Sequence, residues 1–190
     1  MNFDEVFLST AESKYKVHIL HKAGKLKKLV AKLYTTNLTD SVDKIVDRNL
    51  WKILELLYPN TLISDRTALE LKPIQGYLFI ISEKTRQTTI GNITIKPRKG
   101  WPPIDSDTPF MKNLFLTSNE RAVLENARPT RTSKGEISRT FSDIELEEYL
   151  DRTITKYGEY YINKMRDRMK VISKKIGLGK EFEKVIHIAL

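Results

Sequence analysis

The chain has 190 residues, with 33 lysines and arginines against 24 aspartates and glutamates, which gives a formal net charge of +9. It contains no cysteine, so disulfides, thiolate zinc sites and cysteine nucleophiles are excluded together. A hydrophobic content of 40% suffices for the core of one or two small domains, and a disulfide-stapled secreted scaffold is excluded.

No apolar stretch approaches the ~18 residues that cross a bilayer. The opening MNFDEVFLSTAESK lacks the basic start and apolar run of a signal peptide. We therefore expect a cytoplasmic protein. An excess of cations attracts nucleic acid, anionic membrane or acidic protein, so the position of the charge matters more than its sum.

The positive charge is concentrated in residues 14–32, KYKVHILHKAGKLKKLVAK, which hold seven lysines and no acid. The segment LKKLVAKLY within and just beyond this stretch favours two short strands that turn near Ala31 and Lys32. A cationic helix followed by a cationic hairpin is the order of elements in the second half of a winged helix. Spacing alone leaves DNA and an acidic protein open as ligands.

The helix of this basic stretch is expected to run from about Thr10 to Ala23. Ser9 and Glu12 form a capping-box pattern at its start, and Gly24 stands where a C-cap glycine belongs. On a helical wheel the side chains separate by chemistry. One side holds Tyr15, Ile19, Leu20 and Ala23, and another holds Lys14, His18, His21 and Lys22.

Apolar side chains recur at three- and four-residue spacing over residues 42–57, which predicts a core helix capped by Asp40 or Ser41. Ser64 is expected to cap one or two further helical turns. The middle of the chain therefore begins with helices.

Residues 77–81 and 88–97 are rich in β-branched and aromatic side chains, which predicts two β-strands joined by the polar loop SEKTRQ. FMKNLFL, residues 110–116, is expected to form a further strand. Ser118 is then expected to cap a helix over NERAVLENA.

The C-terminal part is expected to be helical. Residues 128–140 are polar and basic and predict a linker. Ser142 and Glu145 form a second capping box, and apolar spacing predicts a helix from Glu159 to Gly177. A last amphipathic helix is expected to begin near Phe182, and we interpret it as truncated at Leu190 because the sequence has no C-cap signal. The lysines and arginines between 163 and 180 are expected to be a solvated face, with binding to a membrane surface as a weaker alternative.

The residues favour no enzymatic chemistry. His18 and His21 have the spacing of a two-histidine metal site, but no carboxylate lies nearby and the surrounding lysines repel a cation. The sequence contains no G-x-S-x-G, no G-x-x-x-x-G-K-[ST], no G-x-G-x-x-G and no H-E-x-x-H. We therefore expect no catalytic activity, no metal and no cofactor.

Four segments together resemble a known bacterial family. They are HKAGKLKKLVAKLYTTNL (21–38), DRNLWKILELLYPNTLISDRTALE (47–70), DTPFMKNLFLTSNERAVLENARPTR (107–131) and GEYYINKMRDRMKVISKKIGLGKEF (158–182). In this order they resemble the region ahead of the catalytic domain in some Fic/DOC family proteins. They are also similar to the AbiE-type antitoxins of type IV toxin–antitoxin systems, and the resemblance covers about residues 10–190.

The resemblance implies a DNA-binding, antitoxin-like regulator, in which an N-terminal winged helix represses transcription and the C-terminal part opposes a toxin. It points to the same cations as the charge map. The residues expected to contact double-stranded DNA are Lys14, His18, His21, Lys22, Lys25, Lys27, Lys28 and Lys32.

Two Fic motifs are absent from this chain. No histidine belongs to the H-P-F-x-x-G-N-G-R loop that transfers AMP. The inhibitory motif (S/T)-x-x-x-E-(G/N) fails at its best candidate, because Arg121 stands four residues before Glu125. We therefore assign neither a catalytic loop nor an inhibitory glutamate.

The sequence predicts an α+β fold with four parts. Residues 1–38 form a truncated winged-helix-like basic element, residues 39–127 an antitoxin-like α+β domain with a β-hairpin, 128–140 a linker and 141–190 a helical bundle. The first hypothesis is a DNA-binding transcriptional regulator, with a cognate toxin as its second partner. The alternative is a protein-interaction region that restrains a Fic catalytic domain in the same or a neighbouring chain and so regulates AMP transfer. Neither hypothesis includes a membrane as partner.

Overall fold

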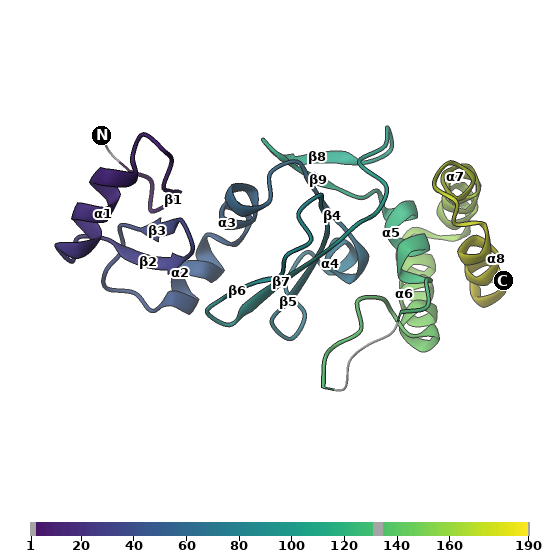
Figure 1. The fold of residues 1–190 in the computed structure, drawn as a ribbon. Helices are drawn as coiled ribbons and strands as arrows, with labels where there is room; N and C mark the ends of the chain where they lie inside the picture. Colours follow the sequence, from purple (N-terminus) through teal and green to yellow (C-terminus); the bar gives the residue numbers. More distant parts are fainter. Residues whose placement is uncertain (1–2, 131–134, 190) are drawn as a thin grey trace.

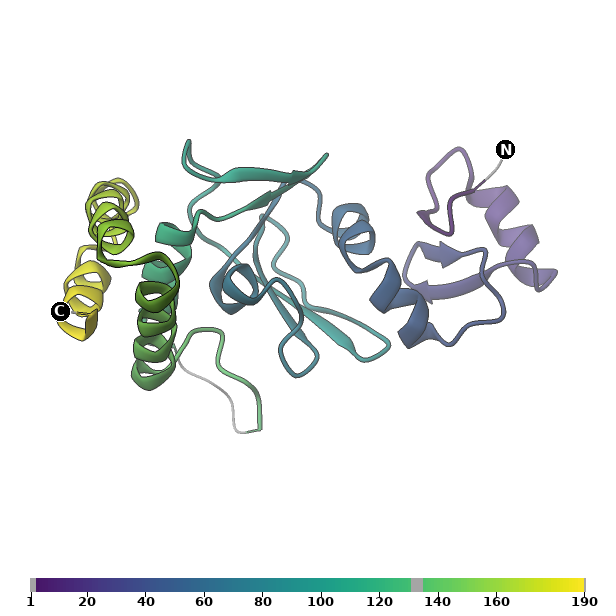
Figure 2. The same cartoon turned by 180° about the vertical axis from the view of Figure 1, so that it is seen from behind.

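The computed structural model describes residues 3–130 and 135–189, and it confirms an α+β fold. The elements follow one another along an elongated molecule (Figure 1). A small three-stranded sheet with its helix lies at the N-terminal end, a six-stranded sheet lies in the middle, and three helices lie at the C-terminal end (Figures 1 and 2). The first and last described residues are therefore at opposite ends of the molecule.

The N-terminal module consists of β1, α1, β2 and β3, with the bounds Val6–Leu8, Lys14–Lys22, Lys27–Val30 and Leu33–Thr35. The predicted hairpin is confirmed, and Lys32 takes a left-handed backbone conformation, with φ of 65°, at its turn. The sequence pattern does not predict β1, which pairs with β3 and gives the order β1-β3-β2. Its three residues are too few to show the alternation of a strand.

Helix α1 begins later than the capping-box pattern predicts. Ser9 does not cap it, because its N–H donates to the carbonyl of Lys32 at 2.8 Å and extends the pairing beside β1. The hydroxyl of Ser13 accepts instead from the N–H of Thr10, at 2.9 Å, in the turn before the helix. The capping-box prediction is therefore wrong. Gly24 does follow the end of the helix, with a left-handed φ of 70°.

Residues 42–57 form two helices, α2 (Val42–Arg48) and α3 (Leu50–Leu57), where the pattern predicts one. The break is at Asn49, whose backbone leaves the helical region and whose side-chain amide donates to the carbonyl of Ile45 at 2.9 Å. The predicted cap at Ser41 is confirmed, since its hydroxyl accepts the N–H of Lys44 at 3.3 Å.

The middle sheet has the order β6-β7-β5-β4-β9-β8. Its strands are Thr61–Ile63 (β4), Tyr77–Ile81 (β5), Thr88–Ile90 (β6), Ile93–Arg98 (β7), Thr108–Met111 (β8) and Leu114–Leu116 (β9). The strand predicted at 77–81 is confirmed, but the strands predicted at 88–97 and 110–116 lie in the hairpins β6–β7 and β8–β9. The pattern does not predict β4. Strand β5 pairs with β7 in parallel, so the chain passes through β6 between them.

One core cluster joins the N-terminal module to the middle sheet. It contains Leu33 of β3, Ile45 of α2, Leu54 of α3 and Ile80 of β5, all of which are buried. The prediction that residues 42–57 lie in the core is therefore confirmed, and α2 and α3 connect the two sheets through apolar contacts.

Two short helices follow strands of the middle sheet: α4 (Asp65–Glu70) follows β4, and α5 (Asn119–Asn126) follows β9. The predicted cap of α5 is confirmed, because the hydroxyl of Ser118 accepts the N–H of Arg121 at 3.3 Å. The predicted cap of α4 is wrong. The hydroxyl of Ser64 is buried and accepts no N–H of that helix, and Asp65 starts the helix with a left-handed φ of 55°.

The helical region consists of α6 (Asp143–Tyr157), α7 (Glu159–Ile176) and α8 (Gly179–Ala189). The predicted capping box is confirmed: the Ser142 hydroxyl accepts the N–H of Glu145 at 3.3 Å, and the Glu145 carboxylate accepts the N–H of Ser142 at 2.8 Å. A second core cluster packs these helices against α5 and includes Leu146, Met165 and Val185. None of the helices in residues 3–130 and 135–189 is long and apolar enough to cross a membrane.

Within the polar segment 128–140, the structure describes all residues except 131–134. Leu190, at which we expect the last helix to be truncated, also lies outside the described residues. The described ends of the segment are joined by hydrogen bonds. The hydroxyl of Thr140 donates to the carbonyl of Arg128 at 3.0 Å and lies 2.8 Å from the hydroxyl of Thr130.

Candidate nucleic-acid interface

One side of α1 packs against the N-terminal sheet. Val17 is buried in a cluster with Phe7 of β1 and Leu26. His21 belongs to the same contact, because its Nδ1 donates to the carbonyl of Leu26 at 3.0 Å and its ring meets the ring of Tyr34 edge-on, with centroids 5.6 Å apart. These contacts decide which side of the helix faces solvent.

The solvent side of α1 carries apolar side chains as well as cations. Tyr15 and Ile19 are 77% and 46% exposed. The other exposed residues of the helix are Lys14, Lys16, His18, His21 and Lys22. The helical wheel groups Tyr15 and Ile19 with Leu20, but of these three only Leu20 contacts the buried cluster. The packing position is instead Val17, because Phe7 of the unpredicted strand β1 lies opposite it.

The lysines of the β2–β3 hairpin point to two sides of the sheet. Lys28 is paired with Tyr34, and cross-strand partners share a face, so Lys28 lies on the face that carries α1. Lys27 lies on the other face, where its ammonium donates to the carbonyl of Asp40 at 2.9 Å. Two more lysines, one before β2 and one at the turn, are exposed: Lys25 and Lys32.

The structure therefore places the basic helix and Lys28 of the hairpin on one side of the N-terminal sheet. Of the predicted contact residues, Lys27 is directed away from α1, and the others are exposed. Strand, helix and hairpin follow one another as in the second half of a winged helix, where the helix enters a groove of DNA and the hairpin is the wing. Helix α1 lies at the outer end of the molecule (Figure 1).

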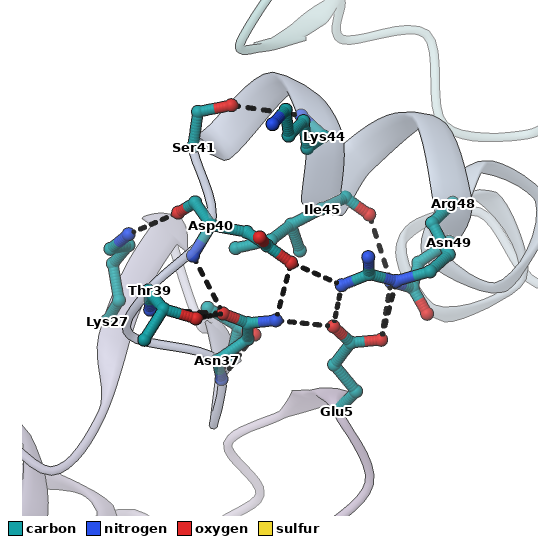
Figure 3. A network of polar contacts seen from close by, with 11 residues as sticks. Glu5, Lys27, Asn37, Thr39, Asp40, Ser41, Lys44, Ile45, Arg48 and Asn49 are labelled. Carbon is teal, nitrogen blue, oxygen red and sulfur yellow. Dashed lines mark hydrogen bonds and ion pairs between the residues drawn. The ribbon is translucent and has the colours of Figure 1, made fainter.

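A polar network fixes the N-terminal module on α2 (Figure 3). The Arg48 guanidinium contacts the carboxylates of Glu5 and Asp40, the latter at 3.0 Å. The amide of Asn37 joins the same two carboxylates, at 3.1 and 2.9 Å, and the amide of Asn49 donates to Glu5 at 3.0 Å. The position of α1 relative to the rest of the chain is thus set by charged groups as well as by the shared core.

This network predicts an acid dependence of stability. Hydrogen bonds from Arg48, and then from Asn49, lower the pKa of the Glu5 carboxyl from 4.5 to about 2. A carboxyl with a lowered pKa stabilises the folded state above its unfolded pKa, and this contribution disappears as the pH falls through the folded value. We expect wild type to be more stable than Glu5→Gln above about pH 4.5, with the difference vanishing toward about pH 2.

Thermal melts of both proteins over this pH range measure the effect. Asp47→Asn, which removes an exposed carboxylate from α2 outside the network, is the matched control and should keep the acid dependence of wild type. An identical pH dependence of wild type and Glu5→Gln would contradict the network.

A second group of charged residues is buried between the middle sheet and the helical region. The wholly buried guanidinium of Arg121 on α5 donates to Asp107 at 2.5 Å and to Glu125 at 3.0 Å. Nearby, the buried carboxylate of Asp65 pairs with Arg98 at 2.7 Å. Sequence reasoning does not reveal this group, because its members are far apart in the chain. The one local signal is the i, i+4 spacing of Arg121 and Glu125.

Both histidines of α1 are exposed, but only His21 also contacts the sheet, through Tyr34 and the carbonyl of Leu26. Within the described ranges, no three His, Cys, Asp or Glu side chains lie close enough together to hold a metal ion. The chemistry of α1 is therefore that of ammonium, imidazole and apolar groups facing solvent.

No protein-family model matches this sequence, and no curated protein sequence matches it. The functional assignment of the chain therefore rests on the chemistry of α1 and the β2–β3 hairpin.

Proposed function

We propose that this chain is a non-catalytic, DNA-binding regulator of the antitoxin type, whose N-terminal module binds double-stranded DNA. The observation that carries the proposal is the exposed side of α1, where lysines surround Tyr15 and Ile19 beside a basic hairpin. The resemblance to AbiE-type antitoxins and to the region ahead of Fic catalytic domains supports the same role. The second partner is then a cognate toxin or a Fic catalytic domain.

The lysines and the centre of α1 have different tasks in this proposal. Ammonium groups bind phosphates of any sequence, and they orient the module on the duplex. The major groove is about 12 Å wide and admits an α-helix, so the side chains in the middle of its exposed side reach base edges. Tyr15 and Ile19 offer apolar contacts to thymine methyl groups, and His18 offers a hydrogen-bonding edge. Exposed apolar side chains without a role in the core gain one here.

A salt series tests the proposal. Binding to a labelled duplex from the promoter of this gene is measured by fluorescence anisotropy, beside a scrambled duplex of equal length. Each neutralised phosphate contributes about −0.9 to the slope of log K against log salt, so five phosphate-bound lysines predict a slope of about −4.5. These five are Lys14, Lys22, Lys25, Lys28 and Lys32. A slope near zero, or no binding at low salt, would refute the proposal.

A further inference from the structure

A cleft of about 400 Å³ lies where the end of β7 meets α5 and the end of α7. The residues that give it chemical character are Arg98, Lys99, Trp101, Glu125, Arg128 and Leu178. Its volume is in the range of about 300–1,000 Å³ that is typical of small-molecule sites. It is separate from the surface of α1, which lies at the other end of the molecule (Figure 1).

Trp101 is presented to this cleft by a loop that cannot easily move. Its carbonyl accepts from Nη2 of the buried Arg121 at 2.7 Å, and the carbonyl of Pro102 accepts from Nη1 at 3.0 Å. Pro102 and Pro103 further restrict the backbone. Even so, the side chain of Trp101 is 53% exposed. The restrained backbone therefore holds a large aromatic ring in solvent, and such a ring can stack against a planar ligand.

Glu125 is one of the residues that line the cleft, and one of its carboxylate oxygens accepts no hydrogen bond from the described residues. The residue is only 3% exposed. Its Oε1 accepts from Nε of Arg121 at 3.0 Å, whereas its Oε2 has no donor in the described part of the chain and lies 3.4 Å from the Arg98 guanidinium. A buried acceptor without a donor is costly, so a ligand N–H that reaches Oε2 gains more than it would in water.

The cleft is lined by more cations than acids. Arg98, Lys99 and Arg128 line the cleft, and Glu125 is the one acid among its described lining residues. Lys99 and Arg128 are exposed, and no ion pair within the described residues engages either of them. Exposed ammonium and guanidinium groups that line a cleft favour a phosphate. Ile176 and Leu178 supply an apolar wall.

We propose that this cleft binds a nucleoside monophosphate whose purine carries an amino group. The purine stacks on Trp101, its amino group donates to Oε2 of Glu125, and the phosphate is bound by Lys99 and Arg128. The proposal does not depend on DNA binding by α1, so each can fail without the other.

Quenching of Trp101 fluorescence by AMP tests the site. Trp51→Phe removes the other tryptophan and keeps an aromatic ring at that position, which packs edge-on against Phe110 with the ring centroids 5.1 Å apart. We expect saturable quenching by AMP and at least about tenfold weaker binding of IMP, because IMP places a carbonyl where AMP places its amino group. Ribose 5-phosphate, which has no base, should bind more weakly still. Calorimetry with the unaltered chain gives the same comparison without the Trp51 substitution.

Three variants separate the contacts. Lys99→Ala with Arg128→Ala should weaken AMP at least tenfold and leave adenosine unchanged, whereas Lys72→Ala, on an exposed loop elsewhere, should change neither. Trp101→Leu, followed by calorimetry, should weaken both. Glu125→Gln, if it folds, should reverse the preference toward IMP, since its amide donates to the carbonyl of IMP.

The outcomes that overturn the proposal are as definite. Absence of saturable AMP binding to the unaltered chain refutes the site. Equal affinity for AMP and ribose 5-phosphate shows an anion site without recognition of a base. Unchanged AMP affinity in Trp101→Leu shows that the ligand binds elsewhere.

Discussion

Replacement of Lys25, Lys28 and Lys32 by Glu is expected to weaken binding to double-stranded DNA about a thousandfold at about 0.1 M salt. Each ammonium that neutralises a phosphate makes the slope of log K against log salt about 0.9 steeper. At about 0.1 M salt, one such contact therefore contributes roughly tenfold to the affinity. Three lost contacts therefore multiply to about a thousandfold, and the slope becomes shallower by about three. All three side chains are exposed, so the free energy of unfolding should change by less than about 0.5 kcal/mol per site.

A matched variant separates a local interface from a general charge effect. Lys72, Lys112 and Lys180 are exposed on a loop, a hairpin turn and helix α8. Their replacement by Glu lowers the net charge from +9 to +3, as the hairpin variant does, because each of three changes removes two charges. The control should keep most of its affinity in the anisotropy assay. Equal losses in the two variants, or no loss in the hairpin variant, would contradict an interface at α1 and the hairpin.

The sequence predicted those elements whose ends are set by neighbouring residues. Ser118 and Ser142 cap α5 and α6 as expected, because each hydroxyl accepts an N–H only three residues away. Gly24 and Gly177 follow α1 and α7 with the left-handed φ that glycine accommodates without strain. Such signals need no knowledge of the rest of the fold.

Prediction failed where the deciding partner is distant in the chain. Ser9 has a capping-box pattern, but its N–H is taken by the carbonyl of Lys32. Asn49 interrupts the predicted single helix, and its amide also donates to Glu5, which precedes β1. Long-range hydrogen bonds of this kind outweigh local propensity, and no window of sequence reveals them.

The candidate interface was visible in the sequence as a run of lysines, but its orientation was not. Lys27 and Lys28 are neighbours in the sequence and lie on opposite faces, because side chains alternate along a strand. The helical wheel places Tyr15 and Ile19 on an apolar side, but both side chains are exposed. The small sheet covers only part of the surface of this nine-residue helix. The Trp101 cleft is assembled from β7, α5 and α7, so its residues share no sequence pattern.

Arg121→Met is expected to lower the free energy of unfolding by about 3–5 kcal/mol. The Arg121 side chain is wholly buried and donates to the carboxylates of Asp107 and Glu125 and to the carbonyls of Trp101 and Pro102. Methionine fills much of the same volume, so the loss comes from two buried carboxylates without their cation. Urea unfolding should measure this change, and the melting temperature should fall by about 6–20 °C for a chain of this size.

The pairing with Glu125 can be measured by a double-mutant cycle. Glu125→Gln should destabilise the Arg121→Met protein less than wild type, with a coupling free energy of about 0.5–3 kcal/mol. Arg121→Lys is the matched control. It keeps the positive charge, but an ammonium cannot donate to a carboxylate and both carbonyls in the geometry of a guanidinium. Its free energy of unfolding should therefore lie between those of wild type and Arg121→Met. If the free energy of unfolding of Arg121→Met is within about 1 kcal/mol of that of wild type, the buried network does not hold the Trp101 loop on α5.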